Sequence, residues 1–300
     1  MSMRYIIGVD GGGTKTVAIA YSLDGEIVSH GESGYGNVMI QAEQAILHVK
    51  EAIQQCLIPL DNQKLEAISL GLAGIASGQY QDKMEKELAF YGVPIFITTD
   101  ARIAHAAVLQ GEDGILVIAG TGSVAVVLER ERIQLAGGWG HLLGDEGSGY
   151  WIAIKAFQHM IREEEEALLR SRLNERILAE LECKEVSQVK RFVYQATKDQ
   201  IARLAVVVSE AAERGCEQAK AILQEAGQLL AHMAVRLYRK TSLPEDVSIG
   251  LMGGVLTNNM LVRSSFTESI ASYMPRANVA VSCESPTKGA FYLAKKQLGL

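Results

Sequence analysis

The sequence has little of what stiffens, cross-links or anchors a protein chain. Its 300 residues include only 5 prolines and 4 cysteines, and the cysteines (Cys56, Cys183, Cys216 and Cys283) form no C-x-x-C pair. This spacing argues against a zinc or iron–sulfur site, so we expect reduced cysteines that pack as small apolar residues. No apolar run approaches the roughly 18 residues of a membrane helix, and no secretory signal is visible at the start. These absences predict a cytoplasmic protein with no membrane partner.

Clustered positive charge is also missing. There are 29 Lys and Arg residues against 35 Asp and Glu residues, which leaves a net charge of −6. A nucleic-acid partner would need a Lys/Arg-rich stripe for its phosphates, and none is present. The one block of like charge is a run of four glutamates at 163–166, and it fits the solvated first turn of a helix.

Glycine is the residue in excess, with 29 copies, and its positions indicate tight turns. The first half of the chain opens with three expected strands, 4–10, 16–22 and 26–33. A helix at 42–57, strands at 66–72 and 94–98, and helices at 79–91 and 101–110 follow. The second half repeats this opening from residue 114, with strands at 115–119, 124–129 and 132–136. We then expect helices at 148–161, 163–181, 188–197, 200–214, 217–240, 259–273 and 286–298, and strands at 247–252 and 279–282. This pattern predicts an α/β protein with mixed sheets flanked by helices.

The first chemical motif reads Asp-Gly-Gly-Gly-Thr-Lys-Thr at 10–16, in the turn between two expected strands. Consecutive glycines let backbone N–H groups approach an anion, and the threonines and Lys15 add donors and a positive charge. A Walker A loop is excluded because that motif opens a helix, and here a strand follows. The interpretation is a phosphate-binding turn, with Asp10 placed to hold a phosphate-bound Mg²⁺.

A second motif, Ala-Gly-Thr-Gly-Ser at 119–123, also joins two expected strands. Its glycines resemble a dinucleotide-binding fingerprint, which would require a helix next. The β-branched run that follows is typical of a strand, so the motif is interpreted as a second phosphate loop. Two such loops from the two halves could hold one triphosphate from both sides.

Three further segments carry candidate site residues. Asp100 lies where a strand ends and a helix begins, a position that by spacing alone favours a helix cap over a general base. The segment 137–148 surrounds Trp139 with glycines and two carboxylates, a composition that suits a sugar with one apolar face and a rim of hydroxyls. The Gly-Gly pair at 253–254 would let a flat ring lie against bare backbone.

Taken in order, these motifs resemble one known family. The chain is similar to the N-acetylglucosamine kinase group of the ATPase family that also contains the activators of benzoyl-CoA reductase and 2-hydroxyacyl-CoA dehydratase. That family belongs to the superfamily of acetate and sugar kinases, heat-shock chaperones and actin. The resemblance implies two ribonuclease H-like, actin-like lobes with the active site in the cleft between them. It places 1–113 and 286–300 in the N-terminal lobe and 114–285 in the C-terminal lobe.

The resemblance also implies roles for individual residues. Asp10 would lie near Mg²⁺, and Asp100 would be the catalytic aspartate, which reverses the preference for a helix cap. The phosphates of ATP would be bound by Gly12, Gly13, Thr14, Lys15, Thr121, Gly122 and Ser123. The adenosine would be bound by Gly253, Gly254 and Asn258. The sugar would be bound by Asn37, Asp100, Gly138, Trp139, Gly140 and Asp145.

The function implied is ATP-dependent phosphorylation of the 6-hydroxyl of an N-acetylated hexosamine, with N-acetylglucosamine first among the candidates. N-acetylmuramic acid and glucosamine are the others, and relatives in the family are often homodimers. Two alternatives stay open: an ATPase activator of a partner dehydratase or reductase, and a sugar-responsive binding protein with an inactive kinase site. The cysteine spacing argues against the activator, and the intact loops with Asp100 argue against the inactive site.

Overall fold

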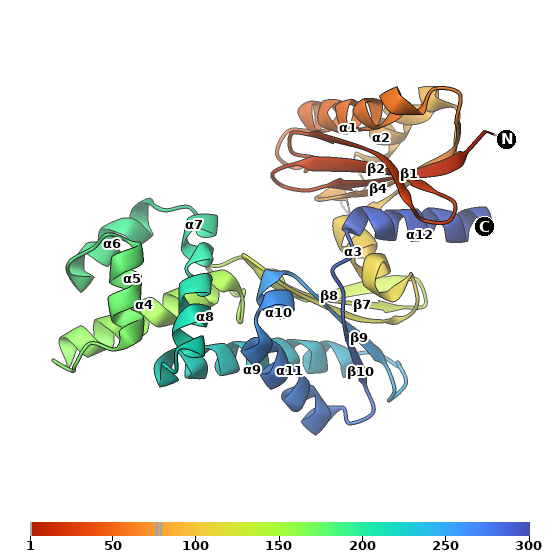
Figure 1. Cartoon of the computed structure of the whole chain (residues 1–300). Coiled ribbons are helices and arrows are strands. Elements are labelled where there is room, and N and C mark those ends of the chain that lie inside the picture. Colours follow the sequence, from red (N-terminus) through yellow and green to blue (C-terminus); the bar gives the residue numbers. More distant parts are fainter. Residues whose placement is uncertain (1, 76–77, 79) are drawn as a thin grey trace. The chain divides into compact units, whose positions relative to one another are not determined.

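The structure, a computed structural model, describes residues 2–75, 78 and 80–300. The chain forms two compact units (Figure 1). Unit 1 consists of the described residues up to Glu112 together with Cys283–Leu300, and unit 2 consists of Asp113–Ser282. Each unit contains one five-stranded mixed sheet.

The sheet of unit 1 has the strand order β3-β2-β1-β4-β5. Its antiparallel part is β1 (Arg4–Gly11), β2 (Thr16–Ser22) and β3 (Ile27–Ser33). On the other side of β1, β4 (Lys64–Leu72) pairs with β1 in parallel, and β5 (Ile95–Thr99) pairs with β4 in parallel. The carboxyl ends of β1, β4 and β5 therefore lie at one edge of the sheet. In an α/β sheet this edge is where ligands usually bind.

Helices cover both faces of this sheet because the buried side chains of β1 alternate. Tyr5, Ile7 and Val9 pack into the core under α1 (Ala42–Leu57) and α2 (Gln81–Leu88). Ile6 points to the other face, where it packs with Phe291 of α12 (Pro286–Leu298). On that face α12 lies beside α3 (Asp100–Leu109). Short 3₁₀ turns follow α1 at Ile58–Leu60 and α2 at Ala89–Tyr91.

Glycines let α12 approach unit 1 closely. A Cβ added to Gly8 of β1 would lie 2.1 Å from the carbonyl oxygen of Thr287, and one added to Gly289 would lie 1.8 Å from that of Ile103. The Thr287 hydroxyl is also within 2.7 Å of the Tyr21 hydroxyl. The last helix of the chain therefore completes the unit that the first strand begins.

Unit 2 repeats the strand plan of unit 1. Its sheet order is β10-β9-β6-β7-β8, formed by β6 (Gly114–Ala119), β7 (Ser123–Glu129), β8 (Arg132–Gly137), β9 (Ser248–Met252) and β10 (Asn278–Val281). The first three strands are antiparallel, and β9 and β10 continue the sheet in parallel. The two predicted glycine turns thus connect the first and second strands of their respective sheets.

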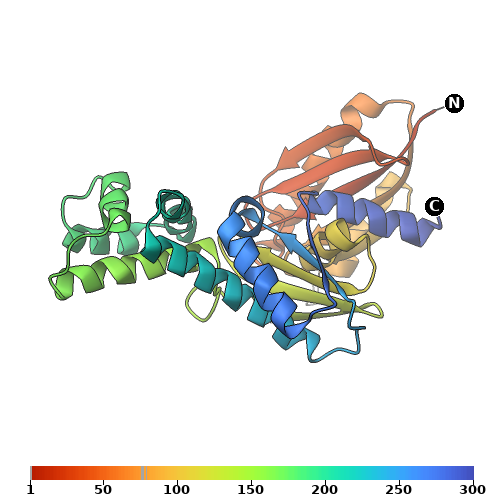
Figure 2. The same cartoon turned by 60° about the horizontal axis from the view of Figure 1, so that its bottom comes forward.

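The helices of unit 2 build one large core around this sheet. The longest, α9 (Glu217–Tyr238), contacts the sheet and packs beside α11 (Met260–Tyr273) (Figure 2). The remaining helices are α4 (Gly149–Glu165), α5 (Arg172–Glu180), α6 (Val186–Gln195), α7 (Lys198–Arg203), α8 (Ala205–Glu213) and α10 (Gly254–Asn258). Among the described residues, no helix combines the length and apolarity needed to cross a membrane.

Most predicted elements are confirmed within two residues, and two predicted helices are wrong. The helix predicted at 200–214 is divided at Leu204, whose N–H donates to the carbonyl oxygen of Ile201 in a tight turn between α7 and α8. The helix predicted at 163–181 is interrupted after α4, and α5 starts anew with Ser171 as its N-cap. The predicted helix start at Gln79 lies outside the described residues.

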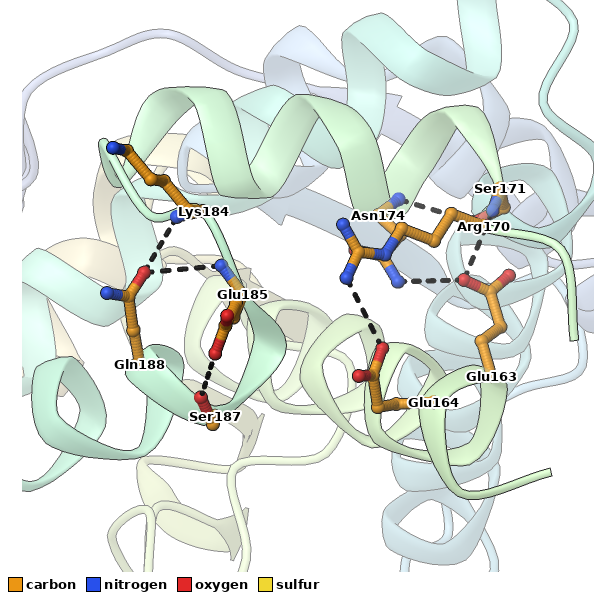
Figure 3. Close-up of polar contacts among 9 residues, drawn as sticks. All are labelled: Glu163, Glu164, Arg170, Ser171, Asn174, Lys184, Glu185, Ser187 and Gln188. Carbon is orange, nitrogen blue, oxygen red and sulfur yellow. Dashed lines mark hydrogen bonds and ion pairs between the residues drawn. The ribbon is translucent and has the colours of Figure 1, made fainter. Parts of the chain in front are cut away.

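The glutamate run is not a solvated first turn. Glu163, Glu164 and Glu165 end α4, and Glu163 is only 4% exposed. Its Oε2 accepts hydrogen bonds from the backbone N–H of Ser171 (3.2 Å) and from Nδ2 of Asn174 (3.0 Å) (Figure 3). Burial alone would raise the pKa of Glu163, but these bonds and the neighbouring His159 lower it below its ordinary value. Glu163 therefore holds the turn between α4 and α5.

Candidate active site

The first glycine turn lies at the carboxyl-end edge of the unit 1 sheet. Gly11 pairs with Thr16 across β1 and β2, and Gly12 N–H donates to the carbonyl oxygen of Lys15 at 2.9 Å. The carbonyl oxygen of Gly12 accepts from the N–H of Gly36 at 2.9 Å, which ties the turn to the segment after β3. The turn is therefore a closed hairpin with its tip in solvent.

The glycines of this turn differ in whether packing requires them. A Cβ on Gly11 would lie 2.5 Å from Leu72 Cδ2, so packing excludes a side chain. A Cβ on Gly13 would meet nothing within 4 Å, and the φ angle of Gly13 is outside the left-handed region. Nothing within unit 1 requires glycine at 13, so the turn has room for a ligand against its backbone.

Two carboxylates flank the turn at the same edge. Asp10 is next to last in β1, in register with Gly71 of β4, which is itself in register with Thr98 of β5. Asp100 comes directly after the last residue of β5 and is the first residue of α3. Burial and, secondly, the negative charge of Asp100 raise the pKa of Asp10 to about 6, against the opposing effect of Lys15. Two acidic groups thus share one site, one half-buried (Asp10) and one exposed (Asp100).

Asp100 is not the cap of its helix. The N-cap is Thr99, whose hydroxyl accepts from the N–H of Arg102 at 3.2 Å. Oδ1 of Asp100 accepts from the N–H of Ala101 at 2.9 Å. Thr99 is thus the helix cap that the spacing suggested for Asp100. The second carboxylate oxygen of Asp100, Oδ2, is then available to a ligand.

The donor set around the turn fits a magnesium ion. Mg²⁺ prefers one or two carboxylates together with water and substrate phosphates, and Asp10 and Asp100 supply the two carboxylates. The buried hydroxyl of Thr16 has no hydrogen-bond partner among the described residues. No cluster of three or more His, Cys, Asp or Glu suited to a metal is found in the described part of the chain. The site is thus suited to a phosphate-linked ion rather than to an all-protein metal cage.

Lys15 and Asn37, two further predicted ligands in unit 1, have partners that they could exchange. Lys15 Nζ lies 3.0 Å from Glu32 Oε2, and both side chains are more than half exposed. Exposed ion pairs of this kind stabilise a protein by about 0–1 kcal/mol. Lys15 can therefore break its pair with Glu32 at little cost in free energy. Asn37 is half-buried, and its Oδ1 accepts from the N–H of Met39 at 2.9 Å.

The second glycine loop is held by the segment that precedes α4. Gly120 N–H donates to the carbonyl oxygen of Gly122 at 2.9 Å, and the carbonyl oxygen of Gly120 accepts from the N–H of Gly149 at 2.7 Å. The Ser123 hydroxyl donates to the carbonyl oxygen of Glu146 at 2.8 Å. A Cβ on Gly120 would meet nothing within 4 Å, so this loop too has bare backbone facing open space.

Asp145, predicted to bind sugar, is buried beside this loop. It is 2% exposed, its Oδ1 accepts from the N–H of Ser123 at 3.4 Å, and its Oδ2 lies 2.8 Å from Lys198 Nζ. Its φ of +62° lies in the left-handed region, which few non-glycine residues adopt. In this structure the carboxylate is satisfied from within unit 2.

The other predicted sugar-loop residues are open to solvent. Trp139 is 75% exposed, and a Cβ on Gly140 would meet nothing within 4 Å. Gly138 and Gly140 have φ values of +71° and +85°, so the turn itself requires glycine there. His141 packs edge-on against Tyr150, with ring centroids 4.7 Å apart, in line with a structural role.

A cavity of about 560 Å³ adjoins the second loop. Gly120 and Thr121 line it from the loop, and Gly254 and Asn258 line it from α10. Gly253 does not line it; its φ of +92° and the 2.4 Å that would separate an added Cβ from the carbonyl oxygen of Ala119 explain this glycine instead.

The sequence predicted helices at 148–161 and 200–214, but not that the helices there line this cavity. Its other walls come from α4, α7, α8 and the residues around α10, and they include Ile152, Asp199, Ala202, Arg203, Val206, Ser209, Glu213 and Asn259. Within this wall, Nδ2 of Asn259 donates a hydrogen bond to the Ser209 hydroxyl at 2.6 Å. The one signal in the sequence was the capping box of Thr197 and Gln200 at the start of α7, which marks a helix but no cavity.

Comparisons with known proteins match nearly the whole chain. A sequence profile described as the BadF/BadG/BcrA/BcrD ATPase family matches residues 7–291. A protein named N-acetylmuramic acid/N-acetylglucosamine kinase from Clostridium acetobutylicum is 31% identical, with 98% of this chain and 99% of that protein covered. A protein named N-acetyl-D-glucosamine kinase from Dictyostelium discoideum is 26% identical, with 98% of each covered.

Structural similarity extends over the same length. A candidate N-acetylglucosamine kinase from Chromobacterium violaceum has a TM-score of 0.74 and is 28% identical, with 98% of this chain and 99% of that chain covered. The predicted fold class, mixed sheets flanked by helices as in actin-like ATPases, is confirmed.

Proposed function

The chain belongs to the BadF/BadG/BcrA/BcrD ATPase family, and from this membership we propose that it transfers the γ-phosphoryl group of ATP to the 6-hydroxyl of an N-acetylated hexosamine. The observation that carries the reaction type is the pair of carboxylates, Asp10 and Asp100, beside a glycine turn at one sheet edge. The sugar class follows from the two relatives named as N-acetylglucosamine kinases.

The nucleotide contacts are proposed as follows. Backbone N–H groups of the bare turn at Gly12 and Gly13, with Thr14 and Lys15, contact the phosphates, as do Thr121, Gly122 and Ser123 of unit 2. The adenosine lies in the cavity of about 560 Å³ beside Gly254 and Asn258, with Gly253 shaping the backbone. A cavity of this size is typical of a small-molecule site.

The proposed sugar contacts are Asn37, Asp100, Gly138, Trp139, Gly140 and Asp145. The exposed face of Trp139 suits the apolar face of a sugar ring. Asp145 could contact a hydroxyl only after its buried carboxylate gives up its present partner, Lys198.

In the proposed reaction the 6-hydroxyl oxygen forms a bond to the γ-phosphorus while the bond to the leaving ADP oxygen breaks. Asp100 orients that hydroxyl and accepts its proton, which leaves a sugar phosphate and ADP. The transition state of phosphoryl transfer is largely loose, so catalysis rests on positioning and charge neutralisation. Mg²⁺ held by Asp10 and the phosphates would supply part of that neutralisation, and Lys15 and the backbone N–H groups supply the rest.

The variant Asp100→Asn tests the proposal. It keeps the shape of the side chain and removes its ability to accept the proton, so kcat should fall about 10²–10⁴-fold. The measurement is ADP release with saturating ATP and N-acetylglucosamine. Asp82→Asn is the matched control, since Asp82 also lies in the first turn of a helix and should not matter. Near-wild-type turnover of Asp100→Asn would remove Asp100 from the role.

A sugar panel separates this function from the alternatives. N-acetylglucosamine, N-acetylmuramic acid, glucosamine and glucose differ at ring positions 2 and 3, so their relative kcat/KM values identify the substrate. ADP release without any sugar would favour an ATPase activator instead. Sugar binding without ADP release would favour an inactive binding protein. A homodimer and a cytoplasmic location stay predictions.

A further inference from the structure

A buried ion pair lies against the second glycine loop and is not explained by the roles assigned above. Lys198 Nζ, from the first residue of α7, lies 2.8 Å from Oδ2 of the buried Asp145. The other oxygen of that carboxylate accepts from the N–H of Ser123 in the loop. Asp145 therefore connects the lysine to the loop through both of its oxygens.

The ammonium group also borders the loop backbone directly. A Cβ added to Gly122 would lie 2.8 Å from Asp145 Oδ2 and 3.0 Å from Lys198 Nζ. Any side chain at position 122 would therefore displace one or both members of the pair. The Lys198 side chain is 32% exposed, whereas that of Asp145 is 3% exposed, so the cation is the member that solvent or a ligand can reach.

The same loop joins this cation to the cavity. Gly120 and Thr121 line the cavity, and so does Asp199, the residue after Lys198. A nucleotide with its base in the cavity would direct its phosphates along the loop toward Gly122. No residue of the loop 120–123 is positively charged. Lysine is a strong phosphate ligand with three donors, of which Asp145 takes one.

We propose that Lys198 donates to a phosphate of the nucleotide bound on the 120–123 loop, and that Asp145 is the positioning residue that holds its ammonium group there. This rests on the proposed function only in that the ligand is a nucleotide. In this arrangement Lys198 keeps its bond to Asp145 and gives another N–H to the phosphate, so Asp145 is then not released to bind the sugar.

A purely structural pair would behave differently. It would tie α7 to the loop, and its loss would weaken binding of adenosine and of phosphorylated nucleotides alike. A phosphate contact affects only ligands that carry the phosphates. The preference for ADP over adenosine is therefore the readout that separates the two roles.

The experiment is equilibrium binding of adenosine, ADP and a non-hydrolysable ATP analogue to the full chain. Lys198→Met should weaken ADP and the analogue about 10- to 100-fold, the range expected for a hydrogen bond to a charged group, and leave adenosine unchanged. Lys198→Arg should restore part of the loss. Lys155→Met is the matched control, because Lys155 pairs with Glu225 at 3.1 Å, its side chain is 35% exposed, and it is not among the residues that line the cavity. Asp145→Asn should lower the preference for ADP over adenosine.

Three results would overturn the inference: unchanged binding of ADP to Lys198→Met, an equal loss of adenosine and ADP, or an equal loss in Lys155→Met. If Asp145→Asn prefers ADP over adenosine as strongly as the wild type does, Asp145 is not the positioning residue. If Lys198→Met fails to fold, the double variant Lys198→Met with Asp145→Asn removes both charges and keeps the comparison possible. Wild-type protein that binds nucleotide but phosphorylates no sugar would refute the proposed function and leave this test intact.

Discussion

The acidity of Asp10 departs clearly from that of the free side chain. Burial and, to a smaller extent, the charge of Asp100 raise its pKa to about 6, and Lys15 opposes this rise. A carboxylate in such surroundings is costly to ionise without a cation. A raised pKa of this kind is expected for a carboxylate whose charge is neutralised by a metal ion when the ion is bound.

Replacing Asp10 by Asn should stabilise the metal-free protein at neutral pH and not at low pH. The folded protein holds the Asp10 proton more tightly than the unfolded chain, in which the carboxyl group titrates near 3.8. As the pH rises from about 4 through about 6, the wild-type free energy of unfolding should therefore fall by at most about 3 kcal/mol, a loss that Asp10→Asn avoids. Urea unfolding across this pH range measures it.

Asp82→Asn is the control, since this exposed residue should leave the pH profile as it is. Added Mg²⁺ should raise the unfolding midpoint of the wild type at neutral pH and not that of Asp10→Asn, because the ion binds the folded state alone. Parallel pH profiles for wild type and Asp10→Asn would show that Asp10 does not titrate in this way.

At the scale of elements, the junction of α4 and α5 shows how a helix pattern can mislead. Apolar spacing runs through 163–181 without a proline or glycine, so the sequence predicts one helix. In the structure Ala167 has a φ of +51°, and Ser171 starts α5 by accepting from the N–H of Asn174 at 3.2 Å. The side chain of Glu163 reaches both residues of the new helix start. A tertiary contact thus overrides local propensity.

Asn174→Ala should destabilise this junction. The change removes the donor to Glu163 Oε2 and leaves a buried carboxylate short of one hydrogen bond, at a cost of about 1–3 kcal/mol. Urea unfolding at neutral pH measures the loss. Glu164→Gln is the control: the adjacent glutamate forms only an exposed pair with Arg170 at 3.5 Å, worth about 0–1 kcal/mol (Figure 3). Equal losses in the two variants would contradict the assigned role of Glu163.

At the scale of the whole molecule, two units with one strand plan each carry a glycine turn after their first strand. Gly13 in unit 1 and Gly120 in unit 2 share a property that few other glycines have. Neither adopts a left-handed φ, and a Cβ on either would meet nothing within 4 Å. Neither packing nor backbone conformation requires glycine at these positions, and the proposed phosphate contacts would explain it.

Gly13→Ala and Gly120→Ala should each raise the KM for ATP about tenfold or more without loss of stability. A new methyl group would separate the phosphates from the backbone donors, and a lost hydrogen bond to a charged group costs about 1.5–3 kcal/mol. Thermal unfolding should be unchanged or slightly higher, since Gly→Ala at a compatible position restricts the unfolded chain. Steady-state ADP release and a thermal scan measure the two effects.

Gly8→Ala provides the contrast, because its Cβ would lie 2.1 Å from the carbonyl oxygen of Thr287. This variant should therefore unfold at a lower temperature than the wild type, unlike Gly13→Ala and Gly120→Ala. If Gly120→Ala leaves the KM for ATP unchanged while Gly13→Ala raises it, the loop of unit 2 does not contact the phosphates.

The strands, the glycine turns and the family could be read from the residues alone, because these depend on local patterns: alternating apolar residues, glycines between strands, and motifs of a few residues. Which distant groups meet depends on how the folded chain brings them together. Lys198 and Asp145 are 53 residues apart and carry no motif that links them, and Asp100 affects the acidity of Asp10 only because β1, β4 and β5 end at one edge. Side-chain charges and cavity walls act through space, and sequence spacing does not measure that distance.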